Sequence, residues 1–431
     1  MFITPGPSRR NVLQFSTGAA IAVASGCAST IDIPRRDNAV IPEMLARDET
    51  YWTGIARAFD TQNNITNVEN GYWGVMAKPI LAAFQEKTNF LNRQTSLFAR
   101  GDMRDEMNHV YQRLSKFLGV NADELLLTRN ATESLQILIG GYNKLRPGDG
   151  ILYTDLDYSA MKSAMSWLAD RRGVNVHTLT LPEPASHDEV IETYINAFDA
   201  HPDLKMILLT HVNNHTGAIH PVREIAAIAK ERGIDVILDS AHAIGQIDFS
   251  LPDMNADFIG MNLHKWIGAP LGCGLVYIRK QRIRDIDRFM NEPGADDDIR
   301  RRAHLGAHNF AAHLTIPAAL DFHETIGISE KEARLRYLRH LWTDVVRDIP
   351  SIDILTSDDP RTVCALTSFR LRGRTSTDDN NAIVQKLKDQ HSIFTVRRTG
   401  PAGGDCVRIT PAIYNSADDV ARIAPALAML E

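Results

Sequence analysis

The sequence predicts an α/β protein, with a large domain built on a mostly parallel sheet and a smaller α+β C-terminal domain. Short apolar runs alternate with polar, helix-forming segments from about residue 70 to residue 280. This alternation is typical of a parallel sheet covered by helices on both faces. Further along, a long helical pattern is followed by separate strand-like runs, which indicates the second domain.

The individual elements follow from the same patterns. The apolar runs that fit buried strands of the large domain are 125–127, 150–153, 206–209, 236–238, 258–260 and 274–277, with helix-forming segments such as 221–230 between many of them. The stretch 279–302 mixes both signs of charge and is expected to be a solvated loop. A helical pattern runs from Ile316 to Arg347 with a break at Gly327, and the strand-like runs 365–371 and 406–410 follow, with a helix between them. We therefore expect an N-terminal arm at 31–68, a large domain at 69–315 and a small domain at 316–431.

The composition excludes several classes of protein. With 431 residues, of which 44% are hydrophobic and 23% charged, the chain has the length and balance of an ordinary two-domain globular protein. Its formal net charge of -6 gives no reason to expect a nucleic acid partner. No apolar run is long enough to predict a membrane-spanning helix. A disulfide framework or a structural metal site is not expected, because the four cysteines are scattered and form no CxxC pair: Cys27, Cys273, Cys364 and Cys406.

Residues 1–30 have the order of features of an export signal. Arg9 and Arg10 precede a weakly apolar segment, 15–24, and small residues follow. Paired arginines before such a segment resemble the twin-arginine signal, which exports folded proteins, so we expect a periplasmic protein. A disordered N-terminus that contains two arginines is the alternative. Residues 24–27 resemble an imperfect lipobox and 26–28 would suit ordinary signal cleavage, so a membrane link is expected only if Cys27 is lipidated.

A lysine and an aspartate stand at the ends of two successive predicted strands. Lys265 closely follows the run 258–260, where a buried ammonium is costly, and one reason to place a lysine there is to condense with an aldehyde. Alone, Lys265 would be read as a loop lysine that reaches solvent. Asp239 directly follows the run 236–238, and it could pair with the protonated ring nitrogen of pyridoxal 5'-phosphate (PLP). Ligands bind at the carboxyl ends of parallel strands, so the two residues together predict a PLP site.

A third loop, 128–134, fits the phosphate of that cofactor. It joins the run 125–127 to a helix that begins near Thr132. Free backbone N–H groups and the helix dipole favour an anion at such a junction, and the Thr132 hydroxyl could add a hydrogen bond. The same polar residues also make an ordinary helix N-cap, and the two interpretations are compatible.

These segments together resemble the class V aminotransferases. The motifs are Asp-Ser-Ala-His at 239–242, Asn-x-His-Lys-Trp at 262–266 and Thr-x-Asn-Ala-Thr at 128–132, and the branch that the chain resembles most is the isopenicillin N epimerase-like one. The resemblance covers roughly residues 65–431. It implies the type I fold of PLP-dependent transferases and a homodimer with active sites at the subunit interface.

The resemblance also implies a role for each residue that matches the motifs. Lys265 would be the catalytic lysine that holds the cofactor, Asp239 would pair with the pyridinium, and His242 would approach the ring hydroxyl. The other cofactor-binding positions would be a stacking aromatic residue, a residue near the ring hydroxyl and four phosphate contacts, namely Tyr158, Asn214, Ala131, Thr132, Asn262 and His264.

The substrate side is assigned by the same resemblance. Arg408 would clamp the α-carboxylate of the substrate, although a surface arginine on an edge strand is the alternative, and Asn70 would belong to the substrate-side loop. The chain departs from the family at Gly306–Ala307, where relatives commonly carry Gly-Thr, so that phosphate contact must be lost or replaced by His308 or Asn309. Desulfurase activity is not expected, because Cys364 and Cys406 fall in or beside strand-like runs and Cys273 is interpreted as a packed residue.

The motifs leave the reaction open. The main hypothesis is an exported PLP enzyme that acts on the amino group or α-carbon of an amino-acid or peptide-like substrate. This could be transamination, oxidative decarboxylation or the tailoring of a siderophore precursor, since exported members of the fold resemble the periplasmic pyoverdine-maturation enzymes. The alternatives are an isopenicillin N epimerase-like racemase and a non-catalytic binding protein on the same fold.

Overall fold

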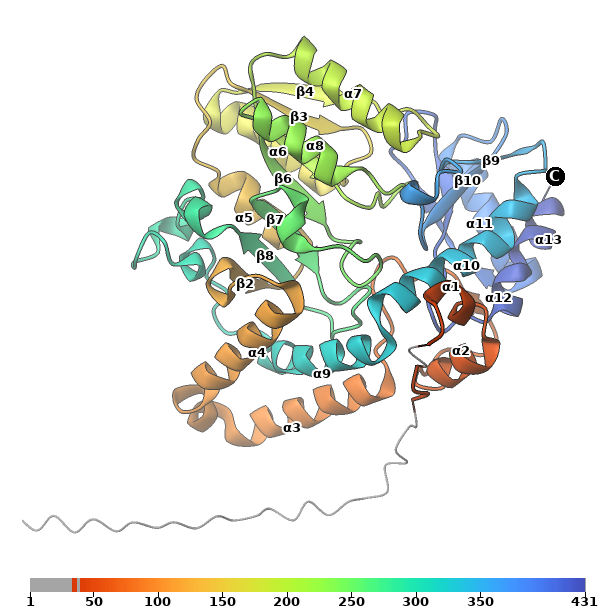
Figure 1. The fold of residues 1–431 in the computed structure, drawn as a ribbon, viewed down its shortest axis with the longest axis horizontal. Coiled ribbons are helices and arrows are strands. Elements are labelled where there is room, and N and C mark those ends of the chain that lie inside the picture. Colours follow the sequence, from red (N-terminus) through yellow and green to blue (C-terminus); the bar gives the residue numbers. More distant parts are fainter. Residues whose placement is uncertain (1–32, 37–38, 431) are drawn as a thin grey trace, which may run out of the picture. The chain divides into compact units, whose positions relative to one another are not determined.

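A sheet of seven strands forms the centre of the protein (Figure 1). The computed structural model describes residues 33–36 and 39–430, so the predicted export signal and Cys27 lie outside the described residues. The strand order is β2-β8-β7-β6-β5-β3-β4. The strands are β2 (Leu125–Thr128), β3 (Gly150–Thr154), β4 (Asn175–Leu179), β5 (Leu204–Thr210), β6 (Asp235–Ser240), β7 (Phe258–Asn262) and β8 (Gly274–Ile278).

The mostly parallel sheet confirms the predicted fold class. Strands β4, β3, β5, β6 and β7 are parallel to their neighbours in that series, and only β8 runs antiparallel, to both β7 and β2. The six predicted apolar runs all lie in strands. The seventh strand, β4, was missed because it lies at the sheet edge and its side chains are exposed or half-buried, which leaves it without a continuous apolar run.

Four helices cover the sheet: α5 (Ala131–Gly141), α6 (Ser159–Arg172), α7 (His187–Ala200) and α8 (Val222–Glu231). Helix α5 packs on β6, β7, β8 and α6, whereas α7 and α8 pack on each other and α8 packs on β6. The crossover from β3 to β4 runs outward and the next two run back along the sheet. Right-handed crossovers therefore put α6 and the α7–α8 pair on opposite faces.

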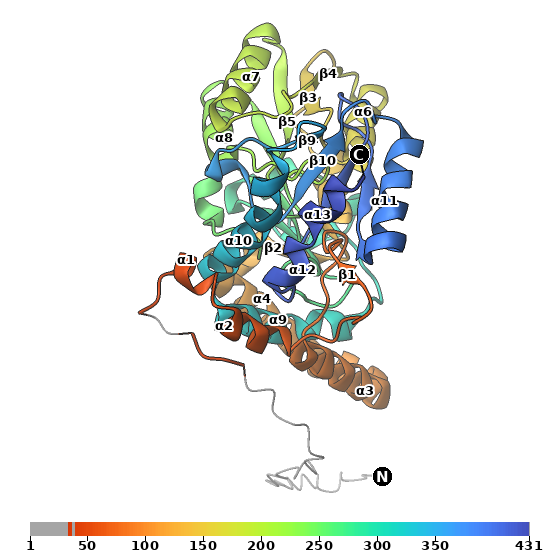
Figure 2. The ribbon, with the colours of Figure 1, turned by 90° about the vertical axis from the view of Figure 1, so that its right-hand side faces the viewer.

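A second, antiparallel sheet forms the C-terminal region, in the order β12-β13-β10-β9. Its strands are β9 (Ile352–Ile354), β10 (Thr367–Leu371), β12 (Val396–Arg398) and β13 (Cys406–Ile409), and its helices are α10 (Ile328–Val346), α11 (Thr377–His391), α12 (Ala417–Ala421) and α13 (Ile423–Ala428). In Figure 2 these strands and α11–α13 form the blue part of the ribbon. Trp342 of α10 and Phe369 of β10 lie in one buried apolar cluster, which confirms the predicted α+β character of this region.

The N-terminal segments join this C-terminal region. Helix α1 (Pro42–Leu45) packs on α10, and α2 (Glu49–Ala56) follows it. Strand β1 (Thr66–Asn67) pairs in parallel with β11 (Ile393–Phe394). Strand β1, which comes shortly before residues that line the cavity described below, is thus held in place by a strand of the C-terminal region. The expected domain boundaries themselves stay a prediction.

Three longer helices complete the fold: α3 (Lys78–Arg100), α4 (Met103–Leu118) and α9 (Phe310–Ile326), with α9 packed on both of the others. The break at Gly327 is confirmed, since this residue separates α9 from α10 with φ +94°. The helix begins at Phe310 rather than at Ile316, because the side chain of Asn309 caps it by accepting a hydrogen bond from the Ala312 N–H at 3.1 Å. Among the described residues, no helix has the length and apolarity that crossing a membrane requires.

The mixed-charge stretch 279–302 is not simply the solvated loop that we expected. It contains three short 3-10 helices: Lys280–Asp285, Phe289–Asn291 and Ile299–Arg302. Ile283, Ile299 and Arg302 are buried, and the Arg302 guanidinium donates hydrogen bonds to the carbonyl oxygen of Ile283 at 2.9 and 3.0 Å. The mixed charge of the stretch gave no sign of these buried positions. An arginine can be buried when backbone carbonyls accept its hydrogen bonds.

Candidate active site

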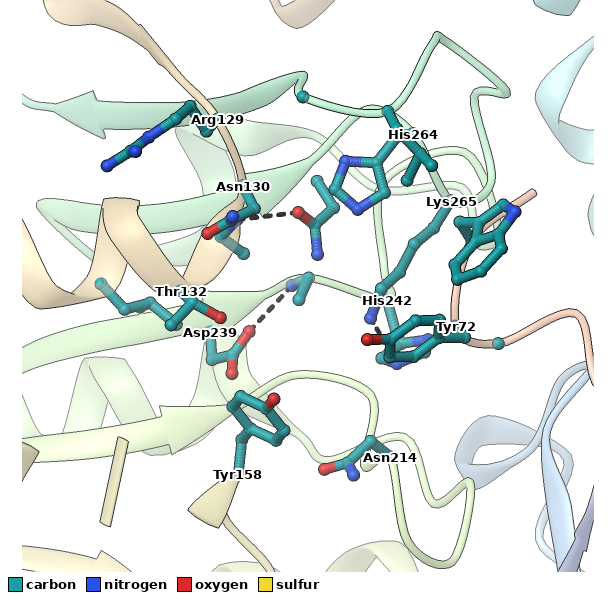
Figure 3. Close-up of a pocket in the computed structure, with 18 of the residues that line it drawn as sticks. Tyr72, Arg129, Asn130, Thr132, Tyr158, Asn214, Asp239, His242, His264 and Lys265 are labelled. Carbon is teal, nitrogen blue, oxygen red and sulfur yellow. Dashed lines mark hydrogen bonds between the residues drawn. The ribbon is translucent and has the colours of Figure 1, made fainter. Parts of the chain in front are cut away.

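A cavity of about 690 Å³ lies at the carboxyl ends of β5, β6 and β7 and beside the start of α5 (Figure 3). The structure brings nine of the predicted site residues to its wall: Ala131, Thr132, Tyr158, Asn214, Asp239, His242, Asn262, His264 and Lys265. They come from five separate segments, which the parallel order of the strands gathers at one edge of the sheet. Asn70 and Arg408 do not line it.

Lys265 follows β7 and reaches His242 across the cavity wall. Its Nζ lies 2.9 Å from Nε2 of His242, and the indole N–H of Trp266 donates to Nδ1 of that histidine at 3.4 Å. His242 therefore accepts at Nδ1 and carries its proton on Nε2. Burial lowers the pKa of Lys265 to about 7, and the charges of Arg408 and Arg398 add to this effect while Asp239 opposes it. A large share of Lys265 is thus the neutral, nucleophilic amine near pH 7.

Asp239 provides a buried carboxylate at the end of β6. It is 6% exposed, and its Oδ1 accepts a hydrogen bond from the Ala241 N–H at 2.9 Å. Burial raises the pKa of Asp239, opposed by that amide and by the charge of Lys265. A buried carboxylate is stabilised by a cation beside it, and the protonated ring nitrogen of PLP is such a cation. The residue therefore fits the predicted cofactor.

Two asparagine side chains accept hydrogen bonds from backbone amides at the start of α5. The Asn130 side chain caps the helix, accepting from the Glu133 N–H at 2.8 Å, and Oδ1 of Asn262 accepts from the Ala131 N–H at 2.7 Å. The first amides of a helix have no partner within the helix. Since the Ala131 amide already donates to Asn262, Thr132 is the residue of this turn whose amide and hydroxyl remain for a phosphate. Ala131 and Asn262 thus hold the turn in place, and their own contacts with a phosphate stay a prediction.

His264 faces the cavity with one defined nitrogen. Its Nδ1–H donates to the carbonyl oxygen of Cys273 at 3.1 Å, so Nε2 is the ring nitrogen that remains for a ligand in the cavity. Burial lowers the pKa of His264 to about 4, with the charge of Lys265 adding to the effect. A bound phosphate would reverse this direction, because an adjacent anion stabilises the protonated imidazole.

Tyr158 and Asn214 lie on the side of the cavity that Figure 3 shows below Asp239. Tyr158 precedes α6 and is 41% exposed, so its ring is available to a flat ligand. The sequence analysis missed the preceding residue, Asp157, which is buried and accepts hydrogen bonds from Thr210 Oγ1 and from the Thr154 N–H. Burial raises the pKa of Asp157 to about 7. An aspartate just after a strand and next to Tyr158 is a sequence feature that could have identified this residue.

Both residues that were predicted for the substrate side have hydrogen-bond partners within the protein, and their contacts with a substrate stay a prediction. Nη2 of Arg408 donates to both carboxylate oxygens of Glu69, at 2.6 and 2.8 Å, and Nη1 donates to the Asn214 carbonyl oxygen at 2.7 Å. The arginine is fully buried, so its hydrogen bonds are directed into the protein. Asn70 donates to the Thr410 carbonyl oxygen at 3.0 Å and accepts from the Tyr414 hydroxyl, which makes it a joint between two chain segments.

The cavity wall also contains residues to which the sequence analysis gave no role. Arg398 lines the cavity, as do Gly71, Tyr72 and Trp73 from the segment after Asn70. The departure from the family at Gly306–Ala307 also falls here, because Ala307, His308 and Asn309 line the same cavity. His308 and Asn309 as replacements for the missing threonine therefore stay a prediction.

The cysteines of the described residues are buried. Cys273, Cys364 and Cys406 are each at most 1% exposed, and burial raises the pKa of all three thiols, to about 12 for Cys364 and about 11 for Cys406. A thiolate nucleophile needs the opposite conditions.

Within the described part of the chain, one group of possible metal ligands lies away from the cavity, formed by His177, His201 and Asp203. The two imidazole rings are stacked, with centroids 3.9 Å apart and planes inclined by 24°. Nearly parallel rings cannot direct their lone pairs at one ion. Nε2 of His177 lies 3.0 Å from the Asp203 carboxylate, so the cluster forms a contact between β4 and the residue before β5.

Comparisons with known proteins agree with this site. The family model described as Aminotransferase class-V matches residues 80–423. Isopenicillin N epimerase of Streptomyces clavuligerus is 26% identical over 388 residues, covering 84% of this chain and 94% of the epimerase. A cysteine desulfurase of Serratia proteamaculans is 24% identical over 350 residues, covering 76% of this chain and 82% of the desulfurase.

Solved structures show the same fold. The apo structure of a cysteine desulfurase from Thermococcus onnurineus NA1 matches with a TM-score of 0.75 and 19% identity, covering 87% of this chain and 97% of that chain. The predicted type I fold of PLP-dependent transferases is thereby confirmed, as is the resemblance to the isopenicillin N epimerase-like branch.

Proposed function

The chain belongs to the aminotransferase class V family, and from that premise we propose that it is a PLP-dependent enzyme. Its substrate would be an amino acid or a peptide-like molecule, and the reaction would occur at the amino group or at the α-carbon. The observation that carries this proposal is that Lys265, 2.9 Å from His242, lines the same cavity as the buried Asp239 at one end of the sheet. Burial depresses the pKa of this lysine to about 7, which suits covalent attachment of an aldehyde cofactor.

Each cavity residue has a task in such an enzyme. PLP, when bound, draws electrons away from the carbon that carries the substrate's amino group. Asp239 would keep the ring nitrogen protonated, and the Nε2–H of His242 would orient the ring hydroxyl. Thr132 would bind the phosphate at the start of α5, and Tyr158 would cover one face of the ring. Lys265 Nζ would accept and return the α-proton of the substrate.

The visible absorption spectrum tests the cofactor. We expect purified protein incubated with PLP to show the long-wavelength band of a lysine-bound cofactor, and Lys265→Ala to lack it. Lys144→Ala is the matched control, because that lysine pairs with Asp285 on the surface and should leave the band unchanged. A colourless wild-type protein in the presence of PLP would refute the proposal.

Epimerisation is the second candidate, and the similarity to isopenicillin N epimerase supports it. Incubation with candidate amino acids in deuterated water separates the two reactions. Exchange of the α-proton without a keto product would favour epimerisation, whereas conversion of the cofactor to its amine form would favour transamination. Protein that binds an amino acid with neither outcome would favour the non-catalytic alternative, against which the presence of both Lys265 and Asp239 in one cavity argues.

We propose export to the periplasm from the sequence of residues 1–30 alone. Replacement of both Arg9 and Arg10 by lysine should hold the protein in the cytoplasm, as measured by cell fractionation. Radiolabelled lipid incorporation that depends on Cys27 would show a membrane anchor. Equal amounts of the wild type and the double variant in the periplasm would contradict the twin-arginine route.

A further inference from the structure

Lys331 is a buried lysine next to the loop that carries Lys265. It lies in the first turn of α10, and its Nζ donates a hydrogen bond to the carbonyl oxygen of Trp266, the residue after Lys265. Its second polar neighbour is His323 of α9, whose Nδ1 lies 3.4 Å from the same nitrogen. The last turns of α9 and the first turn of α10 thus meet at the lysine loop.

The charge of Lys331 has no carboxylate to balance it. The residue is 6% exposed, and burial lowers its pKa to about 7. In the described part of the chain only the Cys364 thiol opposes this shift. Burying an amine without a partner of opposite charge is unfavourable. A methionine of similar length would fill the same space without this penalty, so the contribution of Lys331 lies in its polar end.

The lysine loop has space beside it. Lys265 and Trp266 line a second, smaller cavity of about 40 Å³, which Lys331 lines as well. A cavity next to a segment leaves that segment room to move, because it lacks packing contacts on that side. The carbonyl oxygen of His264, before Lys265, accepts a hydrogen bond from the Gly74 N–H at 2.9 Å. The carbonyl oxygen after Lys265 is held by Lys331.

Helix α10 connects this contact to the C-terminal region. Leu338, Trp342 and Val346, further along the helix, belong to the buried apolar cluster of the C-terminal sheet. Figure 1 shows the helix leading from the end of α9 to that region. Because a packed helix is a rigid element, the position of its first turn depends on how the C-terminal region packs.

We infer that Lys331 is a positioning residue for Lys265: it holds the carbonyl of Trp266 and thereby fixes the direction in which Lys265 enters the main cavity. This inference rests on the proposed function and adds to it the support that keeps the cofactor-binding lysine in place. The loop is held on one side by the Gly74 backbone and on the other by a side chain of α10.

Lys331→Met tests the inference in protein loaded with PLP. Methionine fills a similar volume and removes the hydrogen-bond donor. We expect the amides of the lysine loop, residues 263–269, to exchange their hydrogens about tenfold faster, as measured by mass spectrometry, because the loop opens more readily without this bond. The circular dichroism of the bound cofactor in its visible band should weaken, since that signal requires a fixed orientation of the ring.

Arg339→Met is the matched control. Arg339 is another buried cation of α10, 1% exposed, and it donates to the hydroxyls of Thr367 and Thr356 at 2.7 and 3.0 Å. It lies about two turns beyond Lys331, inside the C-terminal region. Both variants remove a buried donor from the same helix and should lower the free energy of unfolding. Only Lys331→Met should change the exchange of residues 263–269 and the circular dichroism of the cofactor.

A wild-type measurement covers the case in which Lys331→Met does not fold. In urea below the unfolding midpoint, the amides of 263–269 and those of 331–335 should begin to exchange at the same urea concentration. Opening of the lysine loop at a lower concentration than α10 would overturn the inference. A folded Lys331→Met with wild-type exchange and circular dichroism would also overturn it, as would equal changes in Arg339→Met. Absence of the cofactor band in the wild type would instead refute the proposed function, and the exchange measurement needs no cofactor.

Discussion

Lys265 is surrounded by groups that oppose its charge. Burial lowers its pKa, as do Arg408 and Arg398, and only the carboxylates Asp239 and Glu69 favour the ammonium. The result is an amine that loses its proton near neutral pH without a strong base beside it. Arg398 on the cavity wall and the buried Arg408 therefore both lower the pKa of the lysine.

The rate of cofactor uptake should follow this pKa. Because the pKa of Lys265 falls from 10.5 to about 7, the ammonium form dominates below pH 7 and the reactive neutral amine above it. We expect the rate at which cofactor-free protein acquires the PLP band to rise about tenfold per pH unit below neutrality and to level off above it. Stopped-flow absorbance measures this rate, and a rate that keeps climbing to pH 10, as for a free lysine amine, would contradict the prediction.

Gly74 sets the position of the lysine loop. Its N–H donates to the His264 carbonyl oxygen at 2.9 Å, and a side-chain carbon at Gly74 would lie 2.1 Å from the carbonyl oxygen of Lys265. The two backbones can meet only if this residue is glycine. We expect Gly74→Ala to displace the loop and to weaken PLP binding at least about tenfold, since a small misplacement in an active site is costly.

Gly140→Ala is the control for that prediction. Gly140 lies in α5, and an added carbon there would be 3.7 Å from the Trp167 ring, which is ordinary contact. Equilibrium titration of both variants with PLP decides the point. Equal affinities in Gly74→Ala and Gly140→Ala would show that the close approach has no effect on the site.

At the scale of the elements, the register of the sheet places the two main cofactor residues. Asp239 of β6 pairs with Gly260 of β7, and Lys265 follows β7 directly. Parallel neighbours end at the same edge, so the aspartate and the lysine must face one cavity. The start of α5 reaches the same edge because Gly274 of β8 leaves room for the Asn130 backbone, from which a side-chain carbon would be only 2.5 Å away.

The cap of α5 should serve both stability and cofactor binding. Asn130→Ala removes the acceptor of the Glu133 N–H and should lower the free energy of unfolding by about 1 kcal/mol. It should also weaken PLP binding, because the same cap orders the amides that face the phosphate. Urea denaturation and PLP titration measure the two effects.

Ser376→Ala is the matched control. Ser376 caps α11 by accepting from the Asp379 N–H at 3.1 Å, and it lies outside the cavity wall. The two variants should lose similar stability, and only Asn130→Ala should lose PLP affinity. A similar loss of PLP affinity in both would mean that the α5 cap has no specific role at the site.

At the scale of the whole molecule, apolar side chains remain exposed at the cavity. Tyr72 is 65% exposed, Trp73 48% and Leu271 54%, and all three line the cavity wall. Exposed apolar patches of this kind mark interaction surfaces. We propose a second copy of the chain as the partner, in line with the homodimer that the family resemblance implies.

The association state tests this proposal. Analytical ultracentrifugation of the PLP-loaded protein should give twice the mass of one chain. Replacing Tyr72 and Leu271 by serine should shift the equilibrium toward the monomer, because less apolar surface is buried on association. A monomeric wild type at micromolar concentration would contradict the proposal.

Much of the fold could be predicted because buried parallel strands leave continuous apolar runs. All six such runs are strands, whereas the edge strand β4 has no such run and was missed. Helix α9 begins at Phe310, whereas the sequence predicted a start at Ile316. The apolar pattern does not report the cap at Asn309, because that cap is a local polar contact.

The sequence by itself determined the α/β class, the family and the residues at the strand ends, Lys265 and Asp239 above all, because these depend on patterns within short segments. Only the tertiary structure decided which charged groups are paired. Arg408 meets Glu69 across 339 positions of the chain, and the Ala131 amide meets Asn262 across 131. The partner of a buried arginine or amide depends on which distant segments pack together, and no local pattern records that choice.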